Sequence, residues 1–478
     1  MSTPPAAAAV SPVAGPYSRY VSPVAGPYSR YAWHFHGRAM ILLSVWGGVS
    51  IHSEYILLRL LGGTPFHVAI LMAVGTAGLF TGLISGPMMQ GRRKRPFFLI
   101  AGAGGRTGLL IMACANDPTV YILGFALFSV TDAFLIPALT AFYQASYPPA
   151  VRTHFFGRAT MRSVLTLIAV SLSAGVILQH YPWMFRHLLV LAAATGAVGW
   201  WQMARVRMRI RRQPSAPGPA FALPESVADA AGHATSGSPL PAVGTTWRAR
   251  SRNPFVAIVQ LFARDRRFFM FEMLFMFYGV AFMIMNAVIP QYLIDSYGIS
   301  FAQIATARGL LFHAALAFGV PLVVGRLGHR SPMVVCVWAF SGLALVQVVM
   351  IAAPMVDRAL AAEGSLLAPL MVETGGILVL YVGFLMFGLS MSGVHVVWNL
   401  ASIYFAGDDE PTAYQGGHTL LVGVRGATAP FLGVWIAAAF SPATAFASAA
   451  VLFVLGAILM GLMARFDNPP AYSTVGHQ

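Results

Sequence analysis

Twelve mostly apolar stretches, each long enough to cross a bilayer, limit the possible folds of this chain more than any other feature. A transmembrane helix needs about 20 such residues, because the hydrocarbon core of a membrane is about 30 Å thick. Only 9% of the 478 residues are charged, against about a quarter in a soluble domain. We therefore predict an all-α integral membrane protein of about twelve transmembrane helices. The stretches lie near 38–59, 65–87, 97–116, 119–144, 157–180, 186–205, 268–293, 301–324, 332–354, 374–403, 414–438 and 443–464.

The arginines are distributed unevenly between the loops that join these stretches. Loops on the cytoplasmic side of a membrane protein carry an excess of Lys and Arg. The side that the N-terminus shares is rich in them, whereas the opposite loops hold little beyond Arg186 and Arg358. We expect a multi-pass protein of the cytoplasmic (inner) membrane with both termini in the cytoplasm. The basic residues on that side include Arg92, Arg93, Lys94, Arg95, Arg152, Arg158, Arg205, Arg207, Arg209, Arg211, Arg212, Arg326 and Arg330.

Composition divides the chain into two apolar halves and three polar segments. The first polar segment contains an exact tandem repeat of eleven residues, VSPVAGPYSRY, at 10–20 and 21–31. In the second, Asn253-Pro254 is a typical helix start, and it predicts either an amphipathic helix at the membrane surface or the beginning of the seventh span. The expected parts are a disordered cytoplasmic tail (1–37), an N-terminal six-helix bundle (38–205), a cytoplasmic linker (206–266), a C-terminal six-helix bundle (267–465) and a cytoplasmic tail (466–478).

Several classes of protein are disfavoured by residue usage. Cys114 and Cys336 are the only cysteines, so neither a disulfide framework nor a zinc site is expected. Lys94 is the only lysine, which excludes a Gly-Lys-Ser/Thr phosphate loop. The cations form short clusters between apolar runs, which argues against a nucleic-acid partner. We expect no enzyme, no metal site and no cofactor.

The two apolar halves repeat each other at a spacing of 235 residues. At this offset, residues 61–66 lie over 296–301, between the first and second span of each half. Residues 86–95 lie over 321–330, between the second and third span. Shared loop chemistry at equal spacing indicates two six-helix pseudo-repeats, a common plan among secondary transporters.

In these loops the chain resembles the major facilitator superfamily, whose signature there is Gly-x-x-x-Asp-Arg-x-Gly-Arg-Arg. This sequence departs from the signature at the acid, where it has Gln90 in the first copy and Gly325 in the second. The resemblance implies two six-helix bundles around a central cavity, and transport by alternating access. It assigns gating roles to matching loop residues, namely Gly86, Arg92, Arg93, Arg326, Gly328 and Arg330.

Ionisable side chains within the spans are the candidate functional residues, because burying them in a membrane is costly. By the resemblance, spans one, two, four, five, seven, eight, ten and eleven line the cavity, and Arg106 in span three is structural. Glu272 is close enough to one span end to pair with Arg266 or Arg267. The alternative is that each acid pairs with an arginine only to hold helices together. The candidates for substrate or ion binding are Glu54, Asp132, Asn286, Arg308, His395 and Arg425.

These residues lead to a hypothesis about function. Acids in the N-terminal half and arginines in the C-terminal half would give the cavity walls of opposite charge, which suits a small organic anion or amphoteric metabolite. We expect a secondary active transporter that works as a monomer in membrane lipid, with protons as the coupling ion and Asp132 as their carrier. The alternatives are a sensor or assembly factor with a transporter fold, or an efflux pump for drugs or metabolites.

Overall fold

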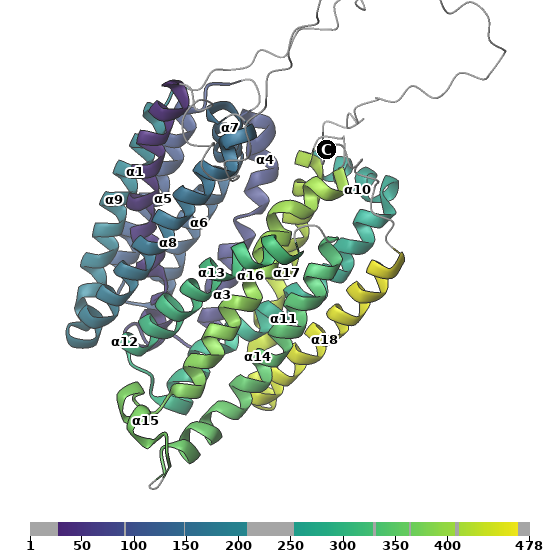
Figure 1. Ribbon diagram of the computed structural model, residues 1–478. Helices are drawn as coiled ribbons and strands as arrows, with labels where there is room; N and C mark the ends of the chain where they lie inside the picture. Colours follow the sequence, from purple (N-terminus) through teal and green to yellow (C-terminus); the bar gives the residue numbers. More distant parts are fainter. Residues whose placement is uncertain are drawn as a thin grey trace, which may run out of the picture.

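The computed structural model describes residues 27–89, 92–147, 149–207, 253–327, 331–362, 365–406 and 411–466, and within these ranges every regular element is a helix. Figure 1 shows two bundles of long helices side by side. The first bundle contains α1 (Pro27–Ser50), α2 (Ser53–Arg59), α3 (Pro65–Ala77), α4 (Phe80–Met89), α5 (Arg95–Ala113), α6 (Pro118–Phe134), α7 (Ile136–Ser146), α8 (Pro149–His180), the 3-10 turn η1 (Pro182–Met184) and α9 (Phe185–Arg205).

The second bundle repeats this plan. It contains α10 (Pro254–Arg264), α11 (Arg266–Tyr297), α12 (Phe301–Ile304), the π-helix η4 (Ala305–Leu311), α13 (Phe312–Leu327), α14 (Pro332–Leu360), α15 (Ala368–Thr374), α16 (Leu378–Ala406), α17 (Pro411–Ala439) and α18 (Pro442–Phe466). Among the described residues, ten helices are long and apolar enough to cross a membrane. Helix α9 and the consecutive helices α3 and α4 complete a set of about twelve spans, as the sequence predicts.

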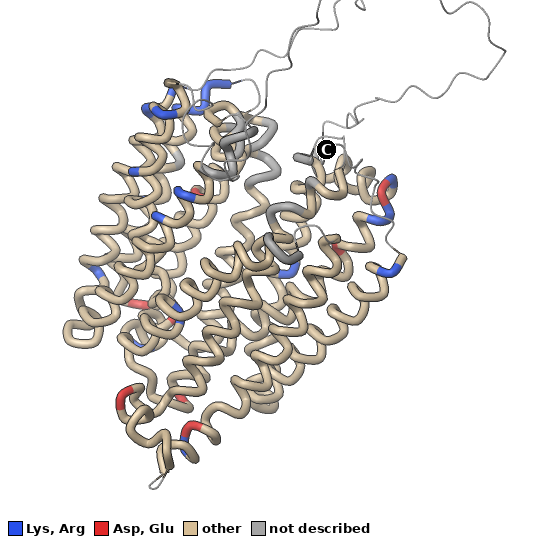
Figure 2. Tube along the Cα trace, viewed as in Figure 1, with Lys and Arg blue, Asp and Glu red and all other residues tan. Residues whose placement is uncertain are grey.

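Each bundle has a linker end and a distal end. The linker end is marked by residues 89, 92–95, 147, 149, 205–207 and 264–266. The distal end is marked by residues 60–64, 114–117, 181–184, 298–300, 361–362 and 365–377. Figure 2 shows basic residues gathered at the linker end of the N-terminal bundle, and the acids Asp295, Asp357 and Glu373 lie at the distal end.

Local sequence explains the sharp turn between α11 and α12 at the distal end. Gly298 ends α11 in the left-handed conformation, with φ of 59°, which glycine adopts without steric cost. Ser300 then caps α12. Its hydroxyl accepts a hydrogen bond from the Gln303 backbone N–H, and the Gln303 side-chain oxygen accepts one from the Ser300 backbone N–H. This reciprocal capping box satisfies two backbone donors that the first helical turn leaves open. It fixes the direction in which the following π-helix runs.

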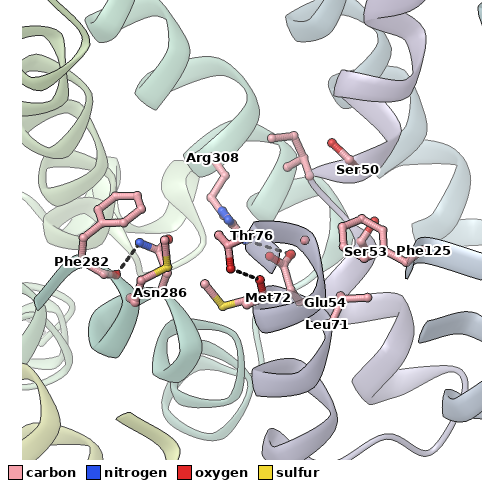
Figure 3. Close-up of a pocket in the computed structure, with 13 residues that line it drawn as sticks. Ser50, Ser53, Glu54, Leu71, Met72, Thr76, Phe125, Phe282, Asn286 and Arg308 are labelled. Atoms are coloured by element: carbon pink, nitrogen blue, oxygen red, sulfur yellow. Dashed lines mark hydrogen bonds and ion pairs between the residues drawn. The ribbon is translucent and has the colours of Figure 1, made fainter. Parts of the chain in front are cut away.

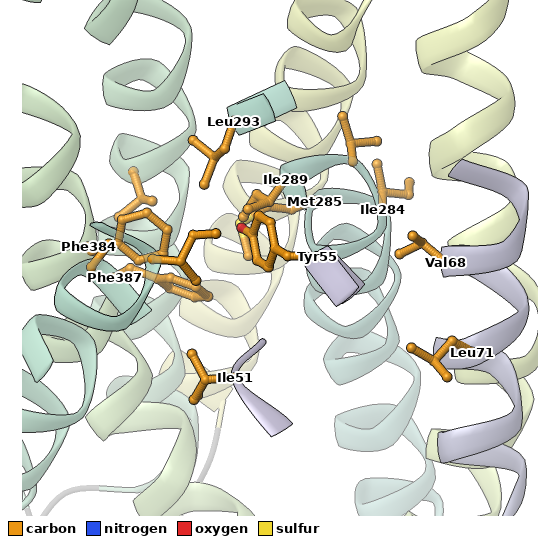
Figure 4. Packing of buried hydrophobic residues seen from close by; sticks show 14 of the residues in the cluster. Ile51, Tyr55, Val68, Leu71, Ile284, Met285, Ile289, Leu293, Phe384 and Phe387 are labelled. Carbon is orange, nitrogen blue, oxygen red and sulfur yellow. The ribbon is translucent and has the colours of Figure 1, made fainter. Parts of the chain in front are cut away.

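Buried apolar side chains form one large cluster that passes from one bundle into the other. Figure 4 shows its central part, where Tyr55 and Leu71 of the first bundle pack with Ile284, Met285 and side chains of the second. The residues that the N-terminal bundle contributes fall within 49–71, 109–128 and 174–193, all in its distal half. The linker half of that bundle has a separate cluster, which includes Phe98 and Trp200. The shared core therefore joins the bundles near their distal ends.

The first helix begins earlier than the sequence analysis expects. Residues 27–37, assigned there to a disordered tail, form the first turns of α1. Tyr28 and Tyr31, from the second copy of the repeat, donate hydrogen bonds to the carbonyls of Arg207 (2.7 Å) and Arg205 (3.1 Å). These tyrosines satisfy backbone acceptors at the end of α9 and so hold the extra turns in place. The first copy of the repeat, most of the linker (208–252) and the C-terminal tail (467–478) lie outside the described residues.

The sequence leaves two alternatives for residues 254–264, and the structure distinguishes them. Helix α10 is separate from α11, since the backbone at Asp265 leaves the helical region with ψ of 84°. Asn253 caps α10 by accepting the Phe255 N–H (3.0 Å), and Asp265 caps α11 by accepting the Phe268 N–H (2.9 Å). Each helix therefore has its own N-cap, and α10 is not the beginning of the seventh span.

Candidate functional site

A pocket of about 310 Å³ lies between the two bundles, in the distal half of the molecule. Both bundles contribute to its wall: α1 to α3 and α6 from the first, and α11 and η4 from the second. Figure 3 shows how side chains from these helices converge on it. Its lining consists of Ser50, Ile51, Ser53, Glu54, Leu71, Met72, Gly75, Thr76, Phe125, Phe282, Met283, Asn286 and Arg308.

An ion pair between the bundles is the strongest charge feature of this pocket. The Arg308 guanidinium Nη1 donates to Glu54 Oε2 at 3.1 Å, and their side chains are only 21% and 15% exposed. Glu54 belongs to α2 and Arg308 to η4, so the contact connects span one with span eight. Removing either partner would leave the other charge poorly solvated, at a cost of about 3–5 kcal/mol for a buried pair.

The π-helix η4 accounts for the placement of Arg308. A π-helix inserts an extra residue into the helical register, which rotates the side chains that follow and often marks a functional site. The wider turn is stabilised locally, because His313 Nδ1 lies 2.7 Å from the Arg308 carbonyl oxygen and can donate a hydrogen bond to it. A regular helix over the same residues would aim Arg308 in another direction.

Polar groups from other helices add to the pocket. Asn286 of α11 donates from its side-chain amide to the Phe282 carbonyl at 2.8 Å. Thr76 of α3 donates its hydroxyl to the Met72 carbonyl at 3.0 Å. Both side chains are thus oriented by their own helices, and they surround the ion pair with groups that can hydrogen-bond to a solute (Figure 3).

Asp132 and Arg106 form a second ion pair, away from this pocket. Their closest atoms lie 3.7 Å apart, between α6 and α5. Arg106 is buried, with its guanidinium 5.2 Å from the centre of the Phe128 ring, whereas the Asp132 side chain is 47% exposed. Neither residue lines the pocket.

The remaining candidates from the C-terminal half lie apart from the pocket as well. Arg425 is buried between α17 and α11, where its Nη1 donates to the Phe275 carbonyl at 3.2 Å. The rings of Phe275 and Tyr278 lie 5.4 and 5.5 Å from its guanidinium carbon. His395 is an exposed residue of α16. Of the six candidate binding residues, the structure brings together Glu54, Asn286 and Arg308.

The expectation that Glu272 pairs with Arg266 or Arg267 is wrong. Glu272 faces into the C-terminal bundle and pairs with His418, whose Nδ1 is 3.0 Å from both carboxylate oxygens. The helical rotation explains the difference: Arg267 points elsewhere and donates to the Tyr404 hydroxyl at 3.0 Å.

The candidate gating residues occupy the linker end where the structure describes them. Gly86 belongs to α4, and Arg92 and Arg93 are exposed between α4 and α5. Arg326 lies in the last turn of α13. Gly328 and Arg330 fall outside the described residues.

Other polar residues that surround the ion pair are not among the candidates that the sequence indicated. Ser53 and Thr76 line the pocket, and His52 is fully buried with its Nε2 3.1 Å from the Ser171 carbonyl oxygen. The polar run His52-Ser53-Glu54 within an apolar span was a signal that could have identified two of them.

Comparison with known proteins identifies the family. The model of the Major Facilitator Superfamily matches residues 37–416, and the chain belongs to that family. A comparison with curated protein sequences gave no significant match. As a member of this family, the chain is a multi-pass membrane protein of a transporter class.

Solved structures agree on the fold. The chain is similar to a mutant of the nucleoside transporter NupG (12% identity, TM-score 0.57, covering 91% of this chain and 98% of that one). It is similar to a bacterial homolog of the human lysosomal transporter Spinster, in an inward-facing and unoccupied conformation (14% identity, TM-score 0.59, covering 92% of this chain and 96% of that one). It is also similar to the human organic anion transporter MFSD10 (13% identity, TM-score 0.56, covering 91% of this chain and 100% of that one). At these identities the likeness concerns the fold alone.

Proposed function

We propose that this protein is a secondary active transporter that moves a small organic anion or amphoteric metabolite across the cytoplasmic membrane. The Glu54–Arg308 ion pair carries the proposal, since it joins the two bundles inside a pocket that both of them line. A solute with a carboxylate or phosphate can replace Glu54 as the partner of Arg308, because such groups match the guanidinium in a bidentate way. If the solute also carries an ammonium group, it can pair with Glu54.

Alternating access follows from the same contact. When the bundles separate at the distal end, the Glu54–Arg308 ion pair breaks. Each of the two charged side chains then needs a new partner in the membrane interior. A bound solute supplies that partner, so binding energy is available to stabilise the opened state. The ion pair, the Phe301–Gln179 bond and the shared apolar cluster lie in the distal half, and the contact of α17 with α4 at Gly423 and Phe80 lies near the middle. This distribution supports a conformation closed at the distal end.

The proposed orientation places the linker end in the cytoplasm. The exposed arginines Arg92 and Arg93 at this end support it, because cytoplasmic loops carry an excess of positive charge. A reporter fused after Arg212 should then read cytoplasmic, and one fused after Glu363 should read periplasmic. Both positions lie outside the described residues, and the opposite result at either of them would reject the orientation.

The proposed transport is coupled to protons and carried out by a monomer, and the protein is not an enzyme. Asp132 is the candidate carrier from the sequence, as an acid within a membrane span. Its pairing with Arg106 is compatible with that role and equally with a structural one.

A binding assay with purified protein tests the substrate class. Probes would be simple dicarboxylates, amino acids, dipeptides and nucleosides, each compared with a lipophilic cation, and the readout would be the shift in melting temperature. We expect an anionic or zwitterionic probe to stabilise the protein and Arg308→Lys to abolish that stabilisation. The control is Arg358→Lys, because the hydrogen bond of Arg358 goes to its own helix, at the Pro354 carbonyl. Selective stabilisation by the lipophilic cation would overturn the proposal and favour an efflux pump for cationic drugs.

A further inference from the structure

The charges that line the pocket limit which solutes it can hold. Among the lining residues that the structure describes, Arg308 is the one cation and Glu54 the one anion, and they pair at 3.1 Å. The pocket is therefore neutral as a whole. A solute with only a negative charge would pair with Arg308 and leave Glu54 without a partner, and an unpaired charge inside a membrane protein is costly. A solute that carries one positive and one negative group satisfies both residues.

The contact between Glu54 and Arg308 also limits how far apart the charges of the solute can be. The π-helix η4 is held close to the N-terminal bundle, since a Cβ added at Gly175 would lie 2.6 Å from Ala305 Cβ. In an α-amino acid the ammonium and the carboxylate are bonded to the same carbon atom, so both fit a site whose two partners touch. The charged ends of a dipeptide are separated by a whole peptide unit and require these partners to lie further apart.

The uncharged part of the wall is mainly apolar. Phe125 from the N-terminal bundle and Phe282 from the C-terminal bundle lie on either side of the ion pair in the view of Figure 3. Each ring packs within its own bundle, with Phe125 6.3 Å from Phe128 and Phe282 5.7 Å from Tyr278, between ring centres. Rings held in this way offer fixed surfaces to an apolar or aromatic side chain. The other apolar lining residues with large side chains are Ile51, Leu71, Met72 and Met283.

Two uncharged polar side chains complete the surroundings of the ion pair. Asn286 and Thr76 each donate a hydrogen bond to a carbonyl of their own helix, so their side-chain oxygens remain to accept N–H groups of an ammonium. The volume of about 310 Å³ is at the small end of the range for ligand sites. A charged head beside the ion pair and a compact apolar remainder against the rings therefore match the pocket.

We infer that the pocket binds an α-amino acid with an apolar or aromatic side chain. The carboxylate pairs with Arg308, the ammonium pairs with Glu54, and the side chain of the solute lies beside Phe125. Gly75 determines the size of that side chain, because a Cβ added at Gly75 would lie 3.1 Å from Phe125 Cε1 and would narrow the space beside the ring. The inference rests on the proposed function, whose anionic and amphoteric solutes it narrows to one class.

Isothermal titration calorimetry of the purified full chain tests the need for both charges. L-phenylalanine should bind about ten- to a hundredfold more tightly than 3-phenylpropionate, which lacks the ammonium, or 2-phenylethylamine, which lacks the carboxylate. L-norvaline should likewise bind more tightly than its isomer 5-aminovalerate, in which the same two charges lie far apart. Glu54→Gln keeps a hydrogen-bonding group for Arg308 but loses the charge, so it should reduce the advantage of L-phenylalanine over 3-phenylpropionate.

Gly75→Ala tests the place of the side chain. It should weaken binding of L-phenylalanine about tenfold and that of L-alanine less than about twofold, because an extra methyl group in an apolar pocket acts mainly on a solute that fills it. Gly157→Ala is the matched control, since Gly157 lies outside the pocket and an added Cβ there meets no atom within 4 Å. Melting temperatures without solute show whether each variant is folded.

The outcomes separate the inference from the proposed function. If 3-phenylpropionate binds as tightly as L-phenylalanine, or if dicarboxylates bind and no α-amino acid does, the inference is wrong and transport of an anion still stands. If 2-phenylethylamine binds most tightly, both are wrong. Equal affinity for L-norvaline and 5-aminovalerate would overturn the α-amino acid class. An equal loss of L-alanine and L-phenylalanine binding in Gly75→Ala would overturn the role of Gly75.

Discussion

In the distal half, the two bundles share an apolar core and are joined by side-chain bonds, whereas the linker half of the N-terminal bundle has a core of its own. Two bonds that join the bundles are Arg308 to Glu54, and the Phe301 N–H to Gln179 (3.1 Å). Both lie near the distal end. Shape follows the same pattern, since Gly175 of α8 allows η4 to approach so closely that an added Cβ would be 2.6 Å from Ala305 Cβ. The distal half is thus built as a closed contact, whereas toward the linker end the described contact between the bundles continues only as far as α17 and α4, at Gly423 and Phe80.

The distal contacts therefore set the balance between the closed and opened conformations. A close-packed apolar contact, a buried ion pair and a glycine-dependent approach are all lost together when the bundles part. We expect substitutions at the distal contact to change the balance between conformations. Substitutions in the linker half should change the stability of one bundle and leave that balance nearly unchanged.

The largest effect is expected from Arg308→Ala. The substitution leaves Glu54 unpaired at a 15% exposed site and removes the group that would bind the solute anion. If the lost pairing is worth about 3 kcal/mol or more, the affinity for an anionic probe that stabilises the wild type should fall roughly a hundredfold or more. Isothermal titration calorimetry would measure it. The double variant Glu54→Ala, Arg308→Ala should recover thermal stability without recovering affinity, and normal affinity in Arg308→Ala would show that the pair only closes the distal end.

Proton coupling through Asp132 is tested by accumulation of a transported probe. In proteoliposomes with an inward proton gradient, Asp132→Asn should abolish that accumulation if Asp132 carries the proton, while counterflow exchange continues. Normal accumulation in Asp132→Asn would leave Asp132 as a structural partner of Arg106.

Gly175→Val should open the distal contact. The added side chain collides with Ala305 Cβ, and overpacking of this kind costs about 1–3 kcal/mol, which shifts the balance of conformations roughly five- to 150-fold. The measurement is labelling of a cysteine placed at Ala302 with a membrane-impermeant maleimide, in a background that lacks Cys114 and Cys336. Gly157→Val on the same helix is the matched control, because an added Cβ there meets no atom within 4 Å. Equal labelling of the two variants would refute a distal gate at this position.

The sequence was sufficient for the fold because the bilayer imposes a length and a composition on every span. It also singled out Glu54, Asn286 and Arg308, which meet in one pocket, and their role in binding stays a prediction. The Glu272–His418 pair could not be foreseen in the same way. It joins residues 146 apart through the rotation of two long helices, which no local pattern encodes. The π-helix that aims Arg308 is likewise a property of packing, because its residues read as an ordinary apolar helix.

The smallest effect is expected from Gln179→Ala. Gln179 Oε1 accepts the backbone N–H of Phe301, the first residue of α12, which has no acceptor within its own helix. Losing a hydrogen bond of this kind costs about 0.5–1.5 kcal/mol, and the donor can recover part of that cost from water once the bundles separate. The cost therefore falls mainly on the closed state, and the opened fraction should rise about two- to tenfold. Maleimide labelling of a cysteine placed at Ala302, in the cysteine-free background, would detect this.

Gln291→Ala is the control, because Gln291 bonds to Asp295 within α11 (2.7 Å) rather than across the bundle interface. Labelling that rises as much in the control would mean that α11 and α12 loosen together, and that the bond from Gln179 has no special part in holding the distal end closed.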